Sequence, residues 1–218
     1  MFRSKIGPRE RIHFVGIGGI GMSGLAQVMK DMGFNVQGSD VANNKNVDRC
    51  KKIGIKVFTK QKKENIKNST IIVRSSAIKD NNPEIKSAKN KKLTILKRAE
   101  MLANVVSLKK NIVITGSHGK TTSTSLISKI LYEAKLDPTI VNGGVINSIN
   151  NNARFGKGDW TVLEADESDG SFLKFKINYS IVTNIDNEHT DYYKNFDNLK
   201  KAFLKFINKT PPIGKSFL

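Results

Sequence analysis

Residues 115–122, TGSHGKTT, lie between the apolar run NIVI and the helix-like run STSLISKILYEA. The loop has the components of a phosphate-binding loop, because Lys120 can neutralise phosphate oxygens and the Thr121 hydroxyl can bind Mg²⁺. The common form of such a loop has four residues between its glycines, whereas here only two separate them. A strand before the loop and a helix after it still predict a triphosphate-binding site. Its residues are Gly116, Ser117, His118, Gly119, Lys120, Thr121 and Thr122.

A second glycine loop, GIGGIG at 16–21, follows the apolar run 11–17 and opens the helix-like run 20–32. Its glycines let the backbone approach a diphosphate at a helix N-terminus. Asp40 ends the next predicted strand, where a ribose-binding acid is expected. Taken alone, this loop would also suit an NAD-binding dehydrogenase or regulatory domain. Together, the two loops predict a protein that couples two phosphorylated molecules.

Short apolar runs alternate with helix-period segments along the whole chain, which predicts parallel, doubly wound α/β structure. The expected strands are 11–17, 34–40, 55–58, 70–77, 93–96, 111–116, 138–141, 160–166 and 179–185. The expected helices are 20–32, 47–54, 82–91, 98–107, 120–134 and 195–208, with Asn82 as the cap of the third. We expect a Gly/Asn-rich loop over 142–159 and a domain boundary near 107–110.

The composition is that of a globular protein with 37 Lys and Arg against 19 Asp and Glu. The net charge of +18 suggests polyanions, but the lysines are scattered in pairs that suit exposed helix faces and form no stripe interleaved with aromatics. We therefore expect no nucleic-acid binding, although a basic DNA-binding protein with a phosphate loop fits the charge. The short apolar runs predict no membrane insertion, and the single Cys50 fits a reducing, cytoplasmic compartment.

An acidic segment, TVLEADESDG at 161–170, ends one of the predicted strands. Strand alternation puts Glu164 on one face with Val162 and Asp166, and a carboxylate beside a phosphate loop is placed to hold Mg²⁺. His189 follows the next predicted strand. A lone histidine is more often a hydrogen-bonded structural residue, and imidazole is an unusual Mg²⁺ ligand. The residues alone leave its role open.

Seven motifs in one order resemble the Mur ligases, from about Ile12 onwards. They are IHFVGIGGIGMSGLAQV, GFNVQGSD, RSSAI, RAEMLA, TGSHGKTTSTSLI, EADESDGSF and TNIDNEHTDYY. In that family the ATP loop resembles T-G-T/S-x-G-K-T-T, so the short loop here is an intact example. One departure is NIDNEH, because relatives more often have a proline before the Asp/Glu-His pair.

The resemblance implies a Rossmann-like parallel-sheet domain over 1–106 that binds UDP-N-acetylmuramate, and a P-loop-type α/β domain over 107–218 that binds ATP. The implied UDP-substrate residues are Gly16, Gly18, Gly19, Gly21, Asp40, Ser75, Ser76 and Ala77. The implied catalytic residues are Lys120, Glu164 and His189, and the implied ligands of Mg²⁺, or of Mn²⁺ in its place, are Thr121, Glu164 and His189.

The activity that the resemblance implies is ATP-dependent ligation of L-alanine to the lactyl carboxylate of UDP-N-acetylmuramate through an acyl phosphate. GIGGIGM favours the alanine-adding member, while a sister ligase for another amino acid or a recycled peptide remains an alternative. The chain halts at SFL (216–218), which looks like the start of another buried strand. We therefore expect an N-terminal fragment with a truncated central domain, without the family's C-terminal ligase domain, and inactive alone.

Overall fold

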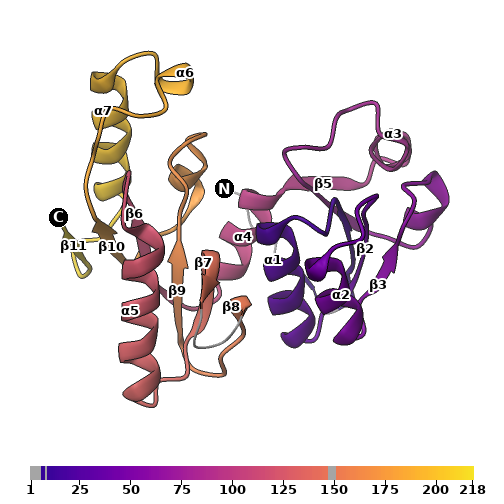
Figure 1. The fold of residues 1–218 in the computed structure, drawn as a ribbon, viewed down its shortest axis with the longest axis horizontal. Coiled ribbons are helices and arrows are strands. Elements are labelled where there is room, and N and C mark those ends of the chain that lie inside the picture. Colours follow the sequence, from indigo (N-terminus) through magenta and orange to yellow (C-terminus); the bar gives the residue numbers. More distant parts are fainter. Residues whose placement is uncertain (1–5, 8, 147–150) are drawn as a thin grey trace. The chain divides into compact units, whose positions relative to one another are not determined.

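The computed structural model describes residues 6–7, 9–146 and 151–218 (Figure 1). The chain divides after Asn104 into two compact units, Met1–Asn104 and Val105–Leu218. The sequence places its domain boundary after residue 106, close to this division. Each unit is a sheet covered by helices, and each carries one of the two glycine loops.

The first unit contains a five-stranded sheet in the order β3-β2-β1-β4-β5, and every pairing in it is parallel. Its strands are β1 (Arg11–Val15), β2 (Asn35–Ser39), β3 (Lys56–Phe58), β4 (Ile71–Arg74) and β5 (Thr94–Lys97). Its helices are α1 (Ile20–Asp31), α2 (Lys45–Lys52), the 3₁₀ helix η1 (Lys63–Ile66), α3 (Pro83–Asn90) and α4 (Arg98–Val106), the last of which crosses the division. The glycine loop follows β1, the central strand, as predicted.

Side-chain caps decide where two helices of this unit begin. Asn82 accepts hydrogen bonds from the amides of Glu84 and Ile85, which confirms the predicted cap of α3. Asn44 caps α2 in the same way, so that helix begins at Lys45, two residues before the predicted start. The apolar periodicity alone did not reveal this polar first turn.

The second unit contains a six-stranded sheet in the order β11-β10-β6-β9-β7-β8. Its strands are β6 (Lys110–Thr115), β7 (Thr139–Ile146), β8 (Asn151–Arg154), β9 (Trp160–Glu164), β10 (Tyr179–Val182) and β11 (Lys215–Phe217). Its helices are α5 (Lys120–Glu133), the 3₁₀ helix η3 (Ser171–Lys174), α6 (Thr190–Tyr193) and α7 (Phe196–Ile207). All pairings are parallel except β7 with β8, and α5 packs on β6, β7 and β9.

Two predictions about this unit are wrong in part. The expected loop over 142–159 contains the end of β7 and all of β8, because an edge pair is held by backbone hydrogen bonds that do not require apolar side chains. The predicted positions 147–150 lie outside the described residues. Residues 216–217 do form strand, as SFL suggested, but the Phe217 side chain is 52% exposed and not buried.

Each unit buries apolar side chains of its own. Phe172 of η3 packs against Phe203 and Phe206 of α7 in the second unit, and all three are fully buried. In the first unit, burial raises the pKa of the Cys50 thiol to about 12, as befits a structural thiol. Among the described residues, no helix combines the length and apolarity needed to span a membrane.

Candidate nucleotide and metal site

The phosphate loop between β6 and α5 depends on two glycines in left-handed conformations. Gly116 has φ +139° and Gly119 has φ +77°. A Cβ on Gly116 would collide with the Thr183 hydroxyl at the end of β10, whereas a Cβ on Gly119 would meet open space. Gly116 is therefore required by both conformation and contact, and Gly119 by conformation alone.

Residues just after β10 hold the loop in shape. The Ser117 amide donates to the Asn184 carbonyl (3.2 Å), and the His118 amide donates to the Asn184 side-chain oxygen (2.9 Å). In return, the Thr183 hydroxyl donates to the His118 carbonyl (2.6 Å), and the Asp186 amide donates to the Ser117 hydroxyl (2.9 Å). Contacts between neighbouring strand ends thus hold the loop in shape.

Lys120 turns inward over its own loop. Its ammonium donates to the carbonyls of Gly116 (2.5 Å) and Ser117 (3.2 Å) and to Oε1 of Glu167 (3.0 Å). The Glu167 side chain is fully buried, and its other oxygen, Oε2, has no hydrogen-bond partner among the described residues. A buried carboxylate needs a cationic partner. Glu167 is therefore the counter-ion of Lys120.

Glu167 was missed by the sequence analysis because β9 ends earlier than expected. The strand stops at Glu164, so the alternation predicted to continue to Asp166 does not apply. The turn that follows leaves Asp166 exposed and carries Glu167 inside. Burial raises the pKa of the Tyr193 hydroxyl well above its ordinary value, and this hydroxyl donates to the Glu167 backbone carbonyl. Glu167 lies within the motif EADESDGSF, but the sequence alone does not show which acidic residue of this motif turns inward.

Two of the predicted metal ligands lie together at the start of α5 and the end of β9. The Thr121 hydroxyl donates to Oε2 of Glu164 (2.9 Å), which also accepts from the Gly143 amide (3.1 Å). A Cβ on Gly143 would collide with the same carboxylate. The hydroxyl and the carboxylate are both oxygen donors, and their role as Mg²⁺ ligands stays a prediction.

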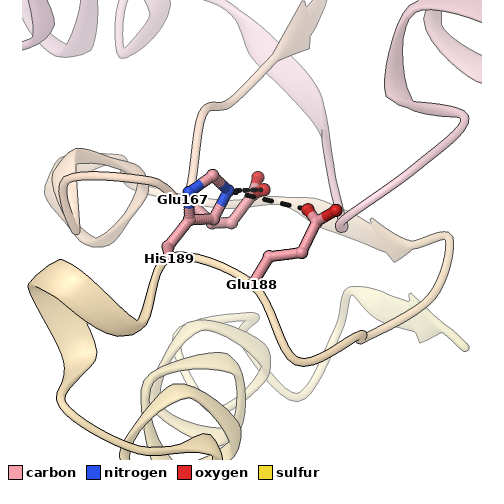
Figure 2. A group of neighbouring side chains, drawn as sticks. All are labelled: Glu167, Glu188 and His189. Atoms are coloured by element: carbon pink, nitrogen blue, oxygen red, sulfur yellow. Dashed lines mark hydrogen bonds and ion pairs between the residues drawn. The ribbon is translucent and has the colours of Figure 1, made fainter.

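The third predicted ligand, His189, lies in a cluster with Glu167 and Glu188 (Figure 2). Its Nε2 is 3.3 Å from Oε1 of Glu167 and 3.8 Å from Oε2 of Glu188. Ligand atoms of the three residues all lie within 4.8 Å of one another. The predicted ligands thus form two groups, and Lys120 links them because it precedes Thr121 and contacts Glu167.

The chemistry of these donors fits a hard divalent cation. A hydroxyl and carboxylates are ligands that Mg²⁺ and Mn²⁺ prefer, whereas the imidazole is the less usual ligand of the set. The orphaned Oε2 of Glu167 is a buried acceptor without a donor among the described residues, as a cation ligand would be. Glu167 and Glu188 therefore extend the set of candidate ligands beyond Thr121, Glu164 and His189.

In the first unit, the predicted diphosphate loop is bound by the strand that follows it. The Gly18 amide donates to Oδ2 of Asp40 (2.7 Å), and the Ala42 amide donates to Oδ1 (2.9 Å). Asp40 therefore contacts the loop. Its carboxylate accepts hydrogen bonds from backbone amides, whereas the sequence analysis expected it to bind a ribose. Whether it also binds a nucleotide stays a prediction.

Two other glycines of this loop, Gly16 and Gly21, lie beside the residues that follow β4 and β5. A Cβ on Gly16 would be 3.1 Å from the Ser75 side chain, so the glycine loop and the segment with Ser75, Ser76 and Ala77 are adjacent. A Cβ on Gly21 would be 3.1 Å from a guanidinium nitrogen of Arg98. Arg98 is a cation beside the diphosphate loop that the sequence analysis did not single out.

Two family models match the chain in succession. The model described as "Mur ligase family, catalytic domain" matches residues 11–110, and the model described as "Mur ligase middle domain" matches residues 114–218. The division of the structure after Asn104 lies near the junction of the two matches. Together the models account for nearly all of the described chain.

Curated relatives and a solved structure agree with these matches. The UDP-N-acetylmuramate–L-alanine ligase of Pelagibacter ubique is 65% identical over 96% of this chain and 45% of its own length. That of Parvibaculum lavamentivorans is 55% identical over 95% of this chain and 42% of its own length. The crystal structure of UDP-N-acetylmuramate-alanine ligase from Thermotoga maritima superposes with a TM-score of 0.84 at 33% identity, over 92% of this chain and 47% of that one. The chain therefore spans less than half the length of these relatives.

Proposed function

This chain belongs to the Mur ligase family, and we propose that it provides the UDP-substrate-binding and ATP-binding units of a UDP-N-acetylmuramate–L-alanine ligase. Relatives of that name match nearly the whole chain at 65% and 55% identity, which supports the choice of this activity within the family. The proposed substrates are UDP-N-acetylmuramate, ATP and L-alanine, and the proposed cofactor is Mg²⁺ or Mn²⁺.

The observation that carries the proposal is the pair of glycine loops, one at the end of an interior strand in each unit. Gly16 follows β1 in the first sheet, and Gly116 follows β6 in the second. Ligands of parallel sheets bind at the carboxyl ends of the strands. Each unit can therefore hold its own phosphorylated molecule, as a ligase that joins a nucleotide-bound acid to an amine requires.

The reaction follows from the chemistry of a free carboxylate, which is a poor acyl electrophile because attack would add charge to an anion. Transfer of the γ-phosphoryl group of ATP to that carboxylate forms an acyl phosphate and releases ADP. The L-alanine amine then attacks the acyl carbon, forms the amide bond, loses a proton and displaces phosphate. Positioning and electrostatics supply most of the catalysis, so no nucleophilic side chain is needed.

Lys120 has the central role in this proposal. When ATP binds, its ammonium would leave Glu167 and neutralise charge on the transferred group. A bound Mg²⁺ would neutralise phosphate oxygens as well, and we propose that Thr121, Glu164 and His189 hold it. The buried Glu167, deprived of Lys120, would then lie beside that cation.

Calorimetry on the 218-residue chain tests the substrate assignment. We expect UDP-N-acetylmuramate and MgATP each to bind, and NADH not to bind. Tight NADH binding without a response to UDP-N-acetylmuramate would replace this proposal with a dehydrogenase-like one. Salt-sensitive binding of duplex DNA would favour a nucleic-acid-binding protein.

The ligation step is measured as phosphate release that depends on both UDP-N-acetylmuramate and L-alanine. The assay compares this chain with the same chain joined to the part of the Pelagibacter relative that it does not match. We expect phosphate release by the joined protein. Assays in which other amino acids replace L-alanine test the sister-ligase alternative. Release that is independent of any amino acid would contradict the proposed reaction.

The proposed metal ligands predict unequal effects. Glu164→Gln should raise the Mg²⁺ concentration needed for half-maximal ATP binding about tenfold, because it removes a charged oxygen ligand. His189→Ala should raise it less, since imidazole is the weaker Mg²⁺ ligand. Magnesium titrations at fixed ATP measure both effects, and Glu133→Gln, an exposed change on α5, is the control. If both site variants titrate as the wild type does, the metal assignment is wrong.

A further inference from the structure

A buried polar network lies in the first unit, outside the residues considered so far. Glu84, in the first turn of α3, is fully buried. Its Oε1 accepts from the Asn65 side-chain amide (2.6 Å), and its Oε2 accepts from the Ser39 hydroxyl (2.5 Å). Nε2 of His13, which is also fully buried, lies 3.4 Å from the same Oε2.

The orientation of His13 follows from its other neighbours. The Gln37 amide nitrogen donates to the Asn65 carbonyl (2.8 Å), which fixes that nitrogen toward the network, and it lies 3.2 Å from Nδ1 of His13. Since an amide nitrogen can only donate, Nδ1 is the acceptor, and Nε2 carries the ring proton. The N–H of the imidazole therefore lies on the side of Glu84, although Nε2 makes no hydrogen bond to any of the described residues.

The network reaches the diphosphate loop through Ser39, the last residue of β2. The Ser39 carbonyl accepts from the amides of both Gly16 (2.9 Å) and Ile17 (3.1 Å). The next residue, Asp40, accepts from the Gly18 amide (2.7 Å). The hydroxyl of Ser39 is thus held by Glu84 on one side, while its carbonyl holds the loop on the other.

We propose that Glu84, through Ser39, is a positioning residue that sets the glycine loop for a diphosphate. This inference rests on the proposed UDP-binding function of the first unit. A fully buried carboxylate is destabilising unless its hydrogen bonds are satisfied, and an apolar side chain would fill the same space more stably. Each Glu84 oxygen has a donor, and a buried carboxylate held in this way fixes one arrangement of the groups around it. The surroundings of Glu84 are the end of β2 and, one hydrogen bond further, the loop that would bind the phosphates.

Two variants of the full 218-residue chain test the proposal, with UDP and UMP as probes. Glu84→Gln keeps the shape but removes the charge, and Ser39→Ala removes the link while leaving Glu84 and its Asn65 partner. In both we expect UDP affinity to fall about tenfold, as for loss of one charge-assisted hydrogen bond. UMP affinity should fall less than UDP affinity, so the ratio of UDP affinity to UMP affinity should drop. MgATP affinity should stay unchanged. Glu64→Gln, an exposed change in η1, is the matched control.

The outcomes separate a positioning role from a structural one. Equal loss of UDP and UMP affinity, or unchanged UDP affinity, would overturn the proposal. If Glu84→Gln does not fold, as judged by loss of a cooperative thermal transition, Ser39→Ala decides the matter by the same ratio. A wild-type chain that binds no UDP would refute the proposed function, and this inference with it. If the wild type binds UDP and the variants keep its ratio of UDP affinity to UMP affinity, only this inference is refuted.

Discussion

Lys120→Ala should weaken MgATP binding by about 10- to 100-fold, which corresponds to loss of charge-assisted hydrogen bonds worth roughly 1.5–3 kcal/mol. The ammonium is the cation that the loop already encloses, with three oxygen acceptors around it. UDP-N-acetylmuramate binding should change little, because that substrate is assigned to the other compact unit. Calorimetry with each ligand measures both effects on one sample. Thr121→Ala should also weaken MgATP binding and spare the UDP substrate.

A control and a double variant separate the two roles of Lys120. Lys129→Ala removes the same charge from an exposed position on α5, where the lysine pairs with Glu133, and it should leave ATP binding unchanged. Lys120→Ala also leaves the buried Glu167 without its cation, so it should lower the free energy of unfolding. Adding Glu167→Gln should restore stability but not ATP binding. Wild-type ATP affinity in Lys120→Ala would refute the assignment of the loop.

Much of the fold could be predicted because the strongest local signals agree with the tertiary structure. Parallel strands are buried on both faces, so β1 and β6 read as short apolar runs, and each ends in a glycine loop before a helix. The end of β7 and all of β8 were missed because residues 142–146 and 151–154 are rich in Asn and Gly and contain no apolar run. Short elements such as α6 are stabilised by tertiary contacts and carry no periodic signal of their own.

The site divides in the same way into residues with a sequence signal and residues without one. Lys120, Thr121 and Glu164 belong to contiguous motifs beside strand ends, and the structure places Thr121 and Glu164 in contact. Glu167 is buried because of the turn that follows β9, and the start of that turn depends on where β9 ends. The buried Glu84 and Ser39 come from different elements and meet only in the folded sheet. Proximity of this kind is a property of tertiary packing, which one sequence does not encode in any local pattern.

Gly116→Ala should lower the free energy of unfolding by about 2–5 kcal/mol, combining left-handed strain of roughly 1–2 kcal/mol with overpacking of roughly 1–3 kcal/mol. A Cβ at this position would collide with Thr183, whose hydroxyl and amide hold the end of β10 to the loop and to β6. The loop would have to move away from β10, so MgATP binding should also be lost. Denaturant titration and calorimetry measure the two losses.

Gly119→Ala is the matched comparison, because Gly119 shares the positive φ but has open space where the Cβ would lie. It should cost only the strain, about 1–2 kcal/mol. The difference between the two variants therefore combines the more extreme φ of Gly116 with the close approach of the phosphate loop to Thr183. If both lose the same stability, that approach does not exist in solution. A larger loss in Gly116→Ala is the result expected if the loop is held against Thr183, because the added methyl group would push the loop away from the residues that fix its shape.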